Sequence, residues 1–320
     1  MSQPGNPPHG WRLTVRVLGV LAVLFGPHAV YSVAQCIELA GVDVRLPGLP
    51  GNSSAPGVIA AGVWLLVRAR SRHDIAPAWC AAGLVLAALV LLPHDGGAAE
   101  AVAVVLLTVA GTWLSAVVGK DTGVRLWARW GGLSRDSAVQ AAVAFGLVVA
   151  GHTASRLLGD QMSRLPGADG AASDDSVLQF GVTALVAGAR EEIPMLALVA
   201  ALMAAARRPT WQILAAVCVI RVLPHLYYGI SGLATLVFAG VSLWAYQVSG
   251  RRIGPIIAGH TAYNLLLVFG GLYGEQALAV FASCGFVVAL AYPNTLRAPS
   301  TPSTPPASST SADPVRTPVR

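Results

Sequence analysis

The sequence is poor in charge. Only 11% of its 320 residues are Asp, Glu, Lys or Arg, whereas 55% are hydrophobic and the mean hydropathy is +0.63. One soluble core cannot use that much apolar surface, so the composition disfavours a soluble globular protein and favours a polytopic membrane protein.

Cysteine motifs are absent as well. The four cysteines, Cys36, Cys80, Cys218 and Cys284, lie in or beside apolar runs and form no CxxC pair. This pattern excludes a zinc knuckle and a disulfide framework, and it is typical of small buried hydrophobic residues.

The net charge of +6 comes almost wholly from arginines, which cluster in short connections between apolar runs. They form no single basic face, so the pattern disfavours nucleic acid as a partner and indicates orientation in a lipid bilayer. The basic connections hold Arg68/Arg70/Arg72, Lys120/Arg125/Arg129/Arg135, Arg207/Arg208, Arg251/Arg252 and Arg297, and they alternate with connections that hold Asp43, Asp95, Asp160/Asp169/Asp174/Asp175 and Glu275. The alternation predicts a multi-pass protein of the cell membrane with both termini in the cytoplasm.

The apolar runs predict an all-α transmembrane bundle of about ten helices. The expected helices cover residues 13–35, 58–67, 75–92, 99–118, 134–158, 177–206, 211–228, 233–248, 255–270 and 276–292. The expected segments are a polar leader (1–11), N-terminal membrane helices (12–158), an Asp/Gly/Ser-rich loop (159–176), a second helical domain (177–292) and a disordered Pro/Ser/Thr-rich tail (293–320).

Six polar residues stand inside the apolar runs of the second half. A charge near the centre of a bilayer costs about 2.5–3.5 kcal/mol on insertion scales and is a functional candidate by default. The six are Glu191, Glu192, Arg221, His225, His260 and Asn264.

Their spacing predicts which of them share a helix face. Arg221 and His225 are four residues apart, as are His260 and Asn264, so each pair projects from one face. Adjacent residues are splayed by about 100° on a helix. The two glutamates are therefore expected to point at different spots.

Two further features bear on the geometry. Pro194 and Pro224 each remove a backbone donor and free the carbonyl four residues earlier, which membrane helices tolerate where protein or a wet cavity satisfies it. At 1.5 Å per residue, His225 lies roughly 20 Å and His260 about 10 Å from the cytoplasmic ends of their spans. Straight helices would keep these two histidines apart.

These motifs carry a family resemblance. The Glu191-Glu192 pair, the RxxxH at Arg221–His225 and the HxxxN at His260–Asn264, in this order on successive membrane helices, resemble the CPBP intramembrane proteases, also called the Abi or CAAX-protease family. The resemblance covers about residues 179–269.

The resemblance implies proteolysis within the membrane, typified by type II CAAX prenyl endopeptidases that cut a tripeptide from prenylated C-termini. It implies that Glu191 is the general base that activates water and that His225 positions or protonates it. His260 and Asn264 would hold the water or stabilise the oxyanion. The implied partners are the lipid bilayer and a peptide or protein substrate.

A metal is the open alternative for activating the water. Glu191, His225 and His260 could instead hold a divalent ion such as zinc. The sequence contains no HExxH motif, so such a site would have to assemble across helices.

The sequence also departs from the family pattern. The usual first motif is EExxxR, and Leu196 stands where the arginine belongs; the usual second motif is FxxxH, and Arg221 stands where the phenylalanine belongs. Our hypothesis is that the arginine partner of Glu192 has moved to the neighbouring helix and that Glu192 and Arg221 support the site as an ion pair.

Several alternatives stay open at this stage. The glutamates could form only a structural ion pair with Arg190 or Arg221, and the protein could be a non-catalytic membrane protein of the same fold, such as a bacteriocin-immunity or scaffold protein. A transporter is a third possibility. His28 and His152 have no partner at helical spacing and are interpreted as packing residues.

Overall fold

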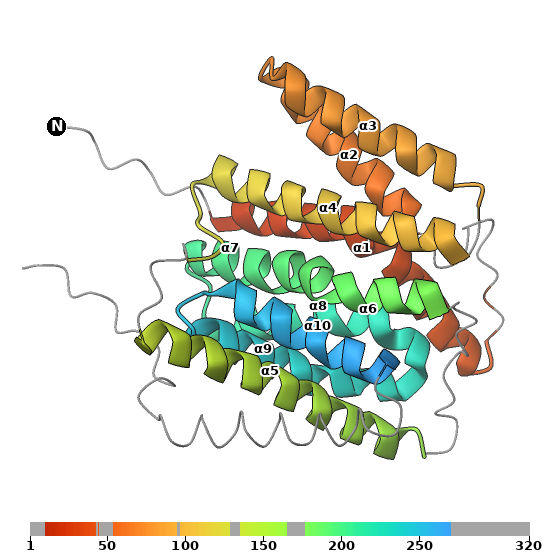
Figure 1. The fold of residues 1–320 in the computed structure, drawn as a ribbon, viewed down its shortest axis with the longest axis vertical. Helices are drawn as coiled ribbons and strands as arrows, with labels where there is room; N and C mark the ends of the chain where they lie inside the picture. Colours follow the sequence, from red (N-terminus) through yellow and green to blue (C-terminus); the bar gives the residue numbers. More distant parts are fainter. Residues whose placement is uncertain are drawn as a thin grey trace, which may run out of the picture.

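In the computed structural model, the described residues are 10–42, 44, 54–94, 97–128, 135–164 and 177–269, and every regular element within them is helical (Figure 1). The elements are α1 (Gly10–Leu39), α2 (Ala55–Ser71), α3 (Ile75–Leu91), α4 (Gly97–Thr122), α5 (Arg135–Met162), α6 (Val177–Glu191), η1 (Glu192–Leu198), α7 (Val199–Ala205), α8 (Thr210–Val222), η2 (Leu223–Ala234), α9 (Thr235–Val248) and α10 (Ile253–Phe269). The all-α prediction is confirmed for these residues.

The expected helices have helical counterparts as far as residue 269. The first of them begins at Gly10, inside the range expected to be a leader, and α5 continues to Met162, inside the expected loop. The tenth expected helix, 276–292, and the expected tail, 293–320, lie outside the described residues.

Four stretches of the described residues are long and apolar enough to cross a membrane. They are Gly10–Leu39, Gly97–Thr122, Asp136–Met162 and Thr210–Val248, the last of which joins α8, η2 and α9. Large apolar side chains such as those of Val67 and Trp79 face outward, with 65% and 75% of their surface exposed. An apolar exterior suits a bundle whose solvent is lipid.

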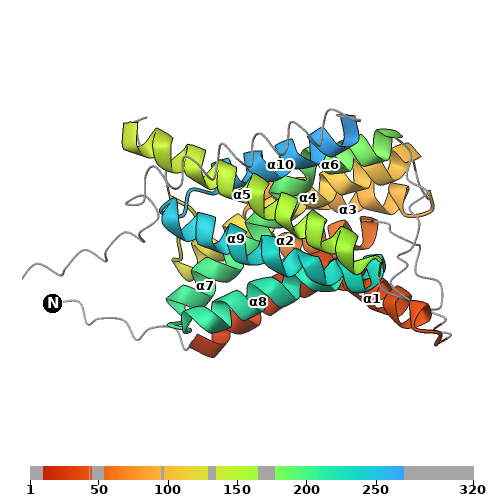
Figure 2. The ribbon, with the colours of Figure 1, turned by 90° about the horizontal axis from the view of Figure 1, so that it is seen from below.

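The centre of the bundle is the rod formed by α6, η1 and α7, which runs between α4 and α10 (Figures 1 and 2). All seven residues of η1 are buried, including Glu192 and Pro194. α5 packs against α9 and α10 on the other side of the site-bearing half. Helices from both halves of the chain therefore pack around the polar residues that the sequence singled out.

Basic turns gather at one end of the bundle. Arg68 Nε lies 2.6 Å and Arg72 Nη2 2.9 Å from the carboxylate of Asp121, which joins the ends of α2 and α4. Just after α4, the backbone N–H of Ala128 donates to the carbonyl oxygen of Arg251, in the turn between α9 and α10, at 3.0 Å. The clustering agrees with the alternation of charge that the sequence shows.

Close approach of α6 and α10 depends on a glycine. A Cβ at Gly188 would lie 2.6 Å from the Thr261 hydroxyl and closer still to the carbonyl oxygen of Ile257. A backbone oxygen cannot move aside without its helix, and small residues are what allow membrane helices to pack at this distance. Gly188 therefore sets the position of α10, which carries His260.

We predict that Gly188→Ala destabilises the protein by about 1–3 kcal/mol, because the added methyl overpacks this contact. Thermal unfolding in detergent micelles measures the loss. Gly83→Ala on α3 is the control, because a Cβ there meets nothing within 4 Å. Equal unfolding temperatures for the two variants would contradict the conclusion that Gly188 sets the contact between α6 and α10.

Candidate active site

The two glutamates lie where the helix changes type. α6 ends at Glu191 and a π-helical segment begins at Glu192, two residues before Pro194. Because Pro194 has no N–H, it cannot bond the carbonyl of residue 190, and a π-turn, which closes over five residues, accommodates the break. π-segments of this kind occur often at functional sites.

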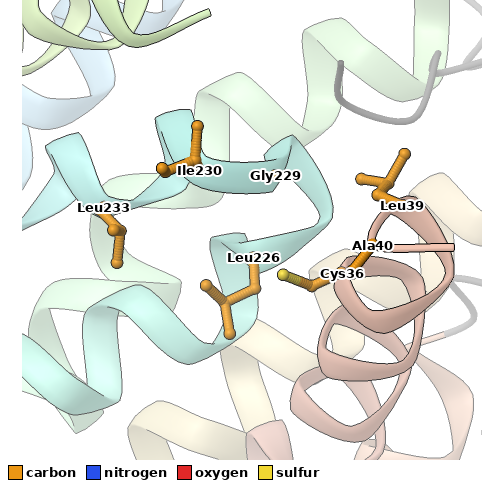
Figure 3. Close-up of a pocket in the computed structure, with 7 residues that line it drawn as sticks. All are labelled: Cys36, Leu39, Ala40, Leu226, Gly229, Ile230 and Leu233. Atoms are coloured by element: carbon orange, nitrogen blue, oxygen red, sulfur yellow. The ribbon is translucent and has the colours of Figure 1, made fainter. Parts of the chain in front are cut away.

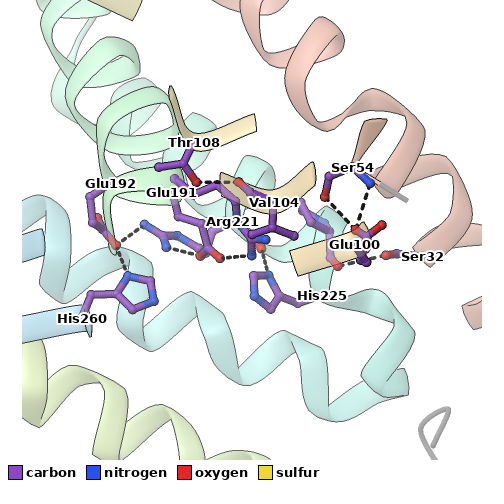
Figure 4. Close-up of polar contacts among 12 residues, drawn as sticks. Ser32, Ser54, Glu100, Val104, Thr108, Glu191, Glu192, Arg221, His225 and His260 are labelled. Atoms are coloured by element: carbon purple, nitrogen blue, oxygen red, sulfur yellow. Dashed lines mark hydrogen bonds and ion pairs between the residues drawn. The ribbon is translucent and has the colours of Figure 1, made fainter. Parts of the chain in front are cut away.

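The prediction that the two glutamates point at different spots is wrong. Arg221 Nη1 lies 2.9 Å from Glu191 Oε2, and Arg221 Nη2 lies 2.9 Å from Glu192 Oε1 (Figure 4). The splay expected for a regular α-helix does not apply at its junction with a π-helix. In addition, the two ends of a guanidinium fork can each take a different carboxylate.

Arg221 pairs with Glu192 from a neighbouring helix, as the hypothesis of a relocated arginine predicts. It stands in the last turn of α8, its side chain is fully buried, and it bridges from that helix to Glu192 on η1. Its guanidinium also lies over the ring of Phe238 on α9, 4.7 Å from the ring centroid. The ion pair between neighbouring helices is thus present in the structure.

A second arginine completes the charge balance. Arg190 Nη2 lies 3.1 Å from Glu191 Oε1, so both oxygens of Glu191 contact a guanidinium. The two carboxylates therefore face two arginines within one buried cluster. Removing one partner from a buried ion pair typically costs about 3–5 kcal/mol, because the remaining charge is left uncompensated.

His260 joins the cluster from α10. Its Nδ1 lies 2.7 Å from Glu192 Oε1, and the residue is only 3% exposed. A carboxylate accepts, so Nδ1 carries the hydrogen and Nε2 is the nitrogen that remains for other chemistry. A carboxylate on one ring nitrogen is a common way to fix the orientation of a functional histidine.

His225 lies on the opposite side of Arg221 from His260 (Figure 4). α8 ends at Val222, and in the 3₁₀ segment that follows His225 Nδ1 lies 2.7 Å from the carbonyl oxygen of Arg221. The carbonyl accepts, so Nδ1 of His225 carries the hydrogen and Nε2 does not. The straight helices assumed from the sequence are replaced by this change of helix type, and both histidines flank one arginine.

Asn264 stands one turn beyond His260 on α10 and is half-buried. Within the described part of the chain it makes no hydrogen bond to the Glu–Arg–His cluster. The four-residue spacing places it on the same face as His260, as the sequence predicted.

The cluster does not fit a metal ion. No group of three His, Cys, Asp or Glu side chains able to hold a metal is found among the described residues. The physical reason is visible in the contacts, because both oxygens of Glu191 and one of Glu192 face guanidinium groups. Guanidinium groups at these carboxylate oxygens compete with a metal ion for the same lone pairs.

Sequence reasoning missed His152 and Phe238. The sequence predicts that His152 on α5 is a packing residue with no partner at helical spacing, and in the structure its ring packs with its centroid 4.4 Å from that of His260 and 3.4 Å from that of Phe238. These contacts join three helices, so no spacing along one helix could have indicated them.

An apolar cavity of about 290 Å³ lies beside the site, between the end of α1 and η2 (Figure 3). Leu226, which follows His225 directly, is one of its lining residues. The others are Cys36, Leu39, Ala40, Gly229, Ile230 and Leu233. None of the charged residues of the cluster lines this cavity.

We predict that Arg221→Met destabilises the protein by about 3–5 kcal/mol, because both glutamates lose their shared cation. The measurement is the free energy of unfolding in mixed micelles. Arg70→Met, on the exposed end of α2, is the matched control and should stay within about 0.5 kcal/mol of the wild type. A loss of unfolding free energy in Arg221→Met no larger than that in Arg70→Met would show that the ion-pair cluster does not stabilise the protein.

Comparison with known proteins is consistent with this geometry. Residues 173–266 match the family described as type II CAAX prenyl endopeptidase Rce1-like. The matched segment runs from just before α6 into α10 and includes all six polar residues that carried the resemblance, which is thereby confirmed. Searches of curated proteins and of solved structures give no match.

Proposed function

We propose that this membrane protein is an endopeptidase that hydrolyses a peptide bond of a membrane-associated substrate, a proposal supported by the match of residues 173–266 to the Rce1-like CAAX endopeptidase family. The observation that carries the proposal is the buried cluster of Glu191, Glu192, Arg221 and His260, with His225 beside it. Ionisable groups held inside apolar helices are expensive, and peptide hydrolysis is a chemistry that uses them.

Glu191 is the proposed general base. Its contacts with Arg190 and Arg221 favour the ionised carboxylate, which is the form that accepts a proton. Each carboxylate oxygen has two acceptor sites, so each can bind water without giving up its arginine. Glu191 takes a proton from that water as the oxygen attacks the peptide carbonyl.

The histidines act on the other charges of the reaction. Protonated His260 donates from Nε2 to the carbonyl oxygen as it becomes negative, while Glu192 holds Nδ1. Asn264, one turn away on the same face, is the second proposed donor. When the tetrahedral intermediate collapses, the C–N bond breaks and the leaving amine takes the proton that Glu191 accepted from water, either directly or relayed through Nε2 of His225.

A non-catalytic role on the same fold is the second candidate. The observation that favours it is the closed pairing of two glutamates with two arginines, which would also suit a structural cluster. Bacteriocin immunity or scaffolding would need the cluster only for folding. Such a protein tolerates Glu191→Gln without loss of function, whereas a protease does not.

The proposed location is the cell membrane, with several helices crossing it and both termini in the cytoplasm. The basic turns at one end of the bundle support this orientation, since Arg-rich connections stay on the cytoplasmic side.

We predict that the purified protein in lipid vesicles cleaves an internally quenched peptide whose cysteine, fourth from the C-terminus, carries a farnesyl group. The same peptide without the lipid reports whether prenylation is needed. Glu191→Gln is expected to lower kcat by about 10²–10⁴-fold, because the general base is lost. His225→Ala and His260→Ala should also lose most activity.

His94→Ala is the matched control for this series. His94 is exposed just beyond α3, and its side chain contacts the carbonyl oxygen of Val90 in the preceding turn. Its replacement should leave cleavage unchanged. Wild-type cleavage by the Glu191→Gln variant would overturn the assignment of the base.

We further predict that 1,10-phenanthroline leaves the cleavage rate unchanged, because guanidinium groups already contact the carboxylate oxygens that would have to ligate a metal ion. The rate is measured before and after incubation with the chelator, with a zinc protease as the positive control. Loss of activity that added Zn²⁺ restores would contradict this expectation.

A further inference from the structure

His152 reaches the proposed site from a helix outside the matched segment. It stands on α5, which precedes residues 173–266, and α5 packs against α9 and α10. Its ring stacks on Phe238 of α9, with centroids 3.4 Å apart and planes 24° apart. The ring of His152 also stacks on that of Tyr263, with centroids 4.4 Å apart and planes 12° apart. Its centroid lies 4.4 Å from that of His260, with the two planes at 56°.

We propose that His152 is a positioning residue, which together with Phe238 fixes the direction in which Nε2 of His260 points. The inference rests on the proposed function in that it assigns His260 a task at the reacting carbonyl.

The hydrogen bond to Glu192 alone does not fix His260. It ties Nδ1 to Glu192 Oε1 at 2.7 Å, but the ring can still swing about that one contact. The rings of Phe238 and His260 meet nearly edge-on, with centroids 5.1 Å apart and planes at 75°. The ring centroid of His152 lies 4.4 Å from that of His260. With rings packed against it in addition to the hydrogen bond, His260 holds Nε2 in one direction.

Phe238 connects this packing to the ion pairs. The same ring that contacts His260 also lies under the guanidinium of Arg221, at 4.7 Å. His152, stacked on Phe238, therefore holds in place the ring that contacts both His260 and the guanidinium of Arg221. A displacement of about 1 Å at a reacting group can lower a rate by about 10²-fold, so modest disorder here is costly.

The ring of His152 makes these contacts, and its Nε2 takes no part in them. Nε2 is buried and has no hydrogen-bond partner among the described residues. The flat ring of phenylalanine should consequently preserve these ring contacts. This distinguishes positioning from a role in proton transfer, which only histidine could fill.

The first test compares His152→Ala with His152→Phe in the peptide cleavage assay. His152→Ala should lower kcat by about 10- to 100-fold with KM little changed, because binding is intact and Nε2 of His260 is misdirected. His152→Phe should restore most of kcat. In the His260→Ala background, His152→Ala should cause no further loss, since the residue acts through His260.

Three outcomes of this test overturn the proposal: an unaffected His152→Ala variant, a His152→Phe variant as impaired as His152→Ala, or losses that multiply in the His260→Ala background. Thr153→Ala is the control on α5, because the Thr153 hydroxyl donates to the carbonyl oxygen of Val149 in its own helix.

The second test needs no substrate and so separates this proposal from the proposed function. Diethyl pyrocarbonate acylates accessible imidazole nitrogens, and mass spectrometry of digests gives the rate at each histidine. Relative to exposed His94, modification of His260 should rise several-fold in His152→Ala and stay at the wild-type level in His152→Phe and Thr153→Ala. The rate at His225 should not change. If His260 reacts equally in all four proteins, His152 does not position it, whether or not the protein cleaves any peptide.

Discussion

The structure of this membrane bundle depends on one buried cation. Arg221 has no exposed surface and sits between the carboxylates of Glu191 and Glu192, each 2.9 Å away. Without it, two carboxylates would have Arg190 as their one arginine partner within the described cluster, and a negative charge would be left uncompensated in an apolar interior, which is costly. Arg190 contacts the other oxygen of Glu191, and His260 shares Glu192 Oε1 with Arg221, so one residue organises contacts from three helical segments. The chemistry proposed for this site is therefore inseparable from the folding of the bundle.

Much of this arrangement could be predicted from the sequence. Runs of apolar residues place helices as far as residue 269, because a helix in lipid must carry its own apolar surface. The absence of an arginine at position 196 and the presence of Arg221 correctly indicated an ion pair between neighbouring helices, since a buried glutamate needs a cation from somewhere. Spacing also placed His225 one turn from Arg221. These inferences succeed because each depends on local periodicity or on charge balance.

Other features could not be predicted, for two physical reasons. The convergence of Glu191 and Glu192 on one guanidinium requires a π-segment, and the only sequence signal for it is Pro194, which fits a simple kink equally well. The contacts of His152 with Phe238 and His260 arise from packing among α5, α9 and α10, whose relative rotation no single helix encodes. The first case changes how residues already identified meet, and the second adds His152 and Phe238 around them.

The most direct test of the shared cation is a double-mutant cycle between Arg221 and Glu192. Unfolding free energies in mixed micelles are compared for Arg221→Met, Glu192→Met and the double variant. If Arg221 and Glu192 neutralise each other, the double variant loses less than the two single losses combined, with a coupling energy of about 1–3 kcal/mol. Single losses that add to within about 0.5 kcal/mol would contradict the account, because residues that share an ion pair do not behave independently.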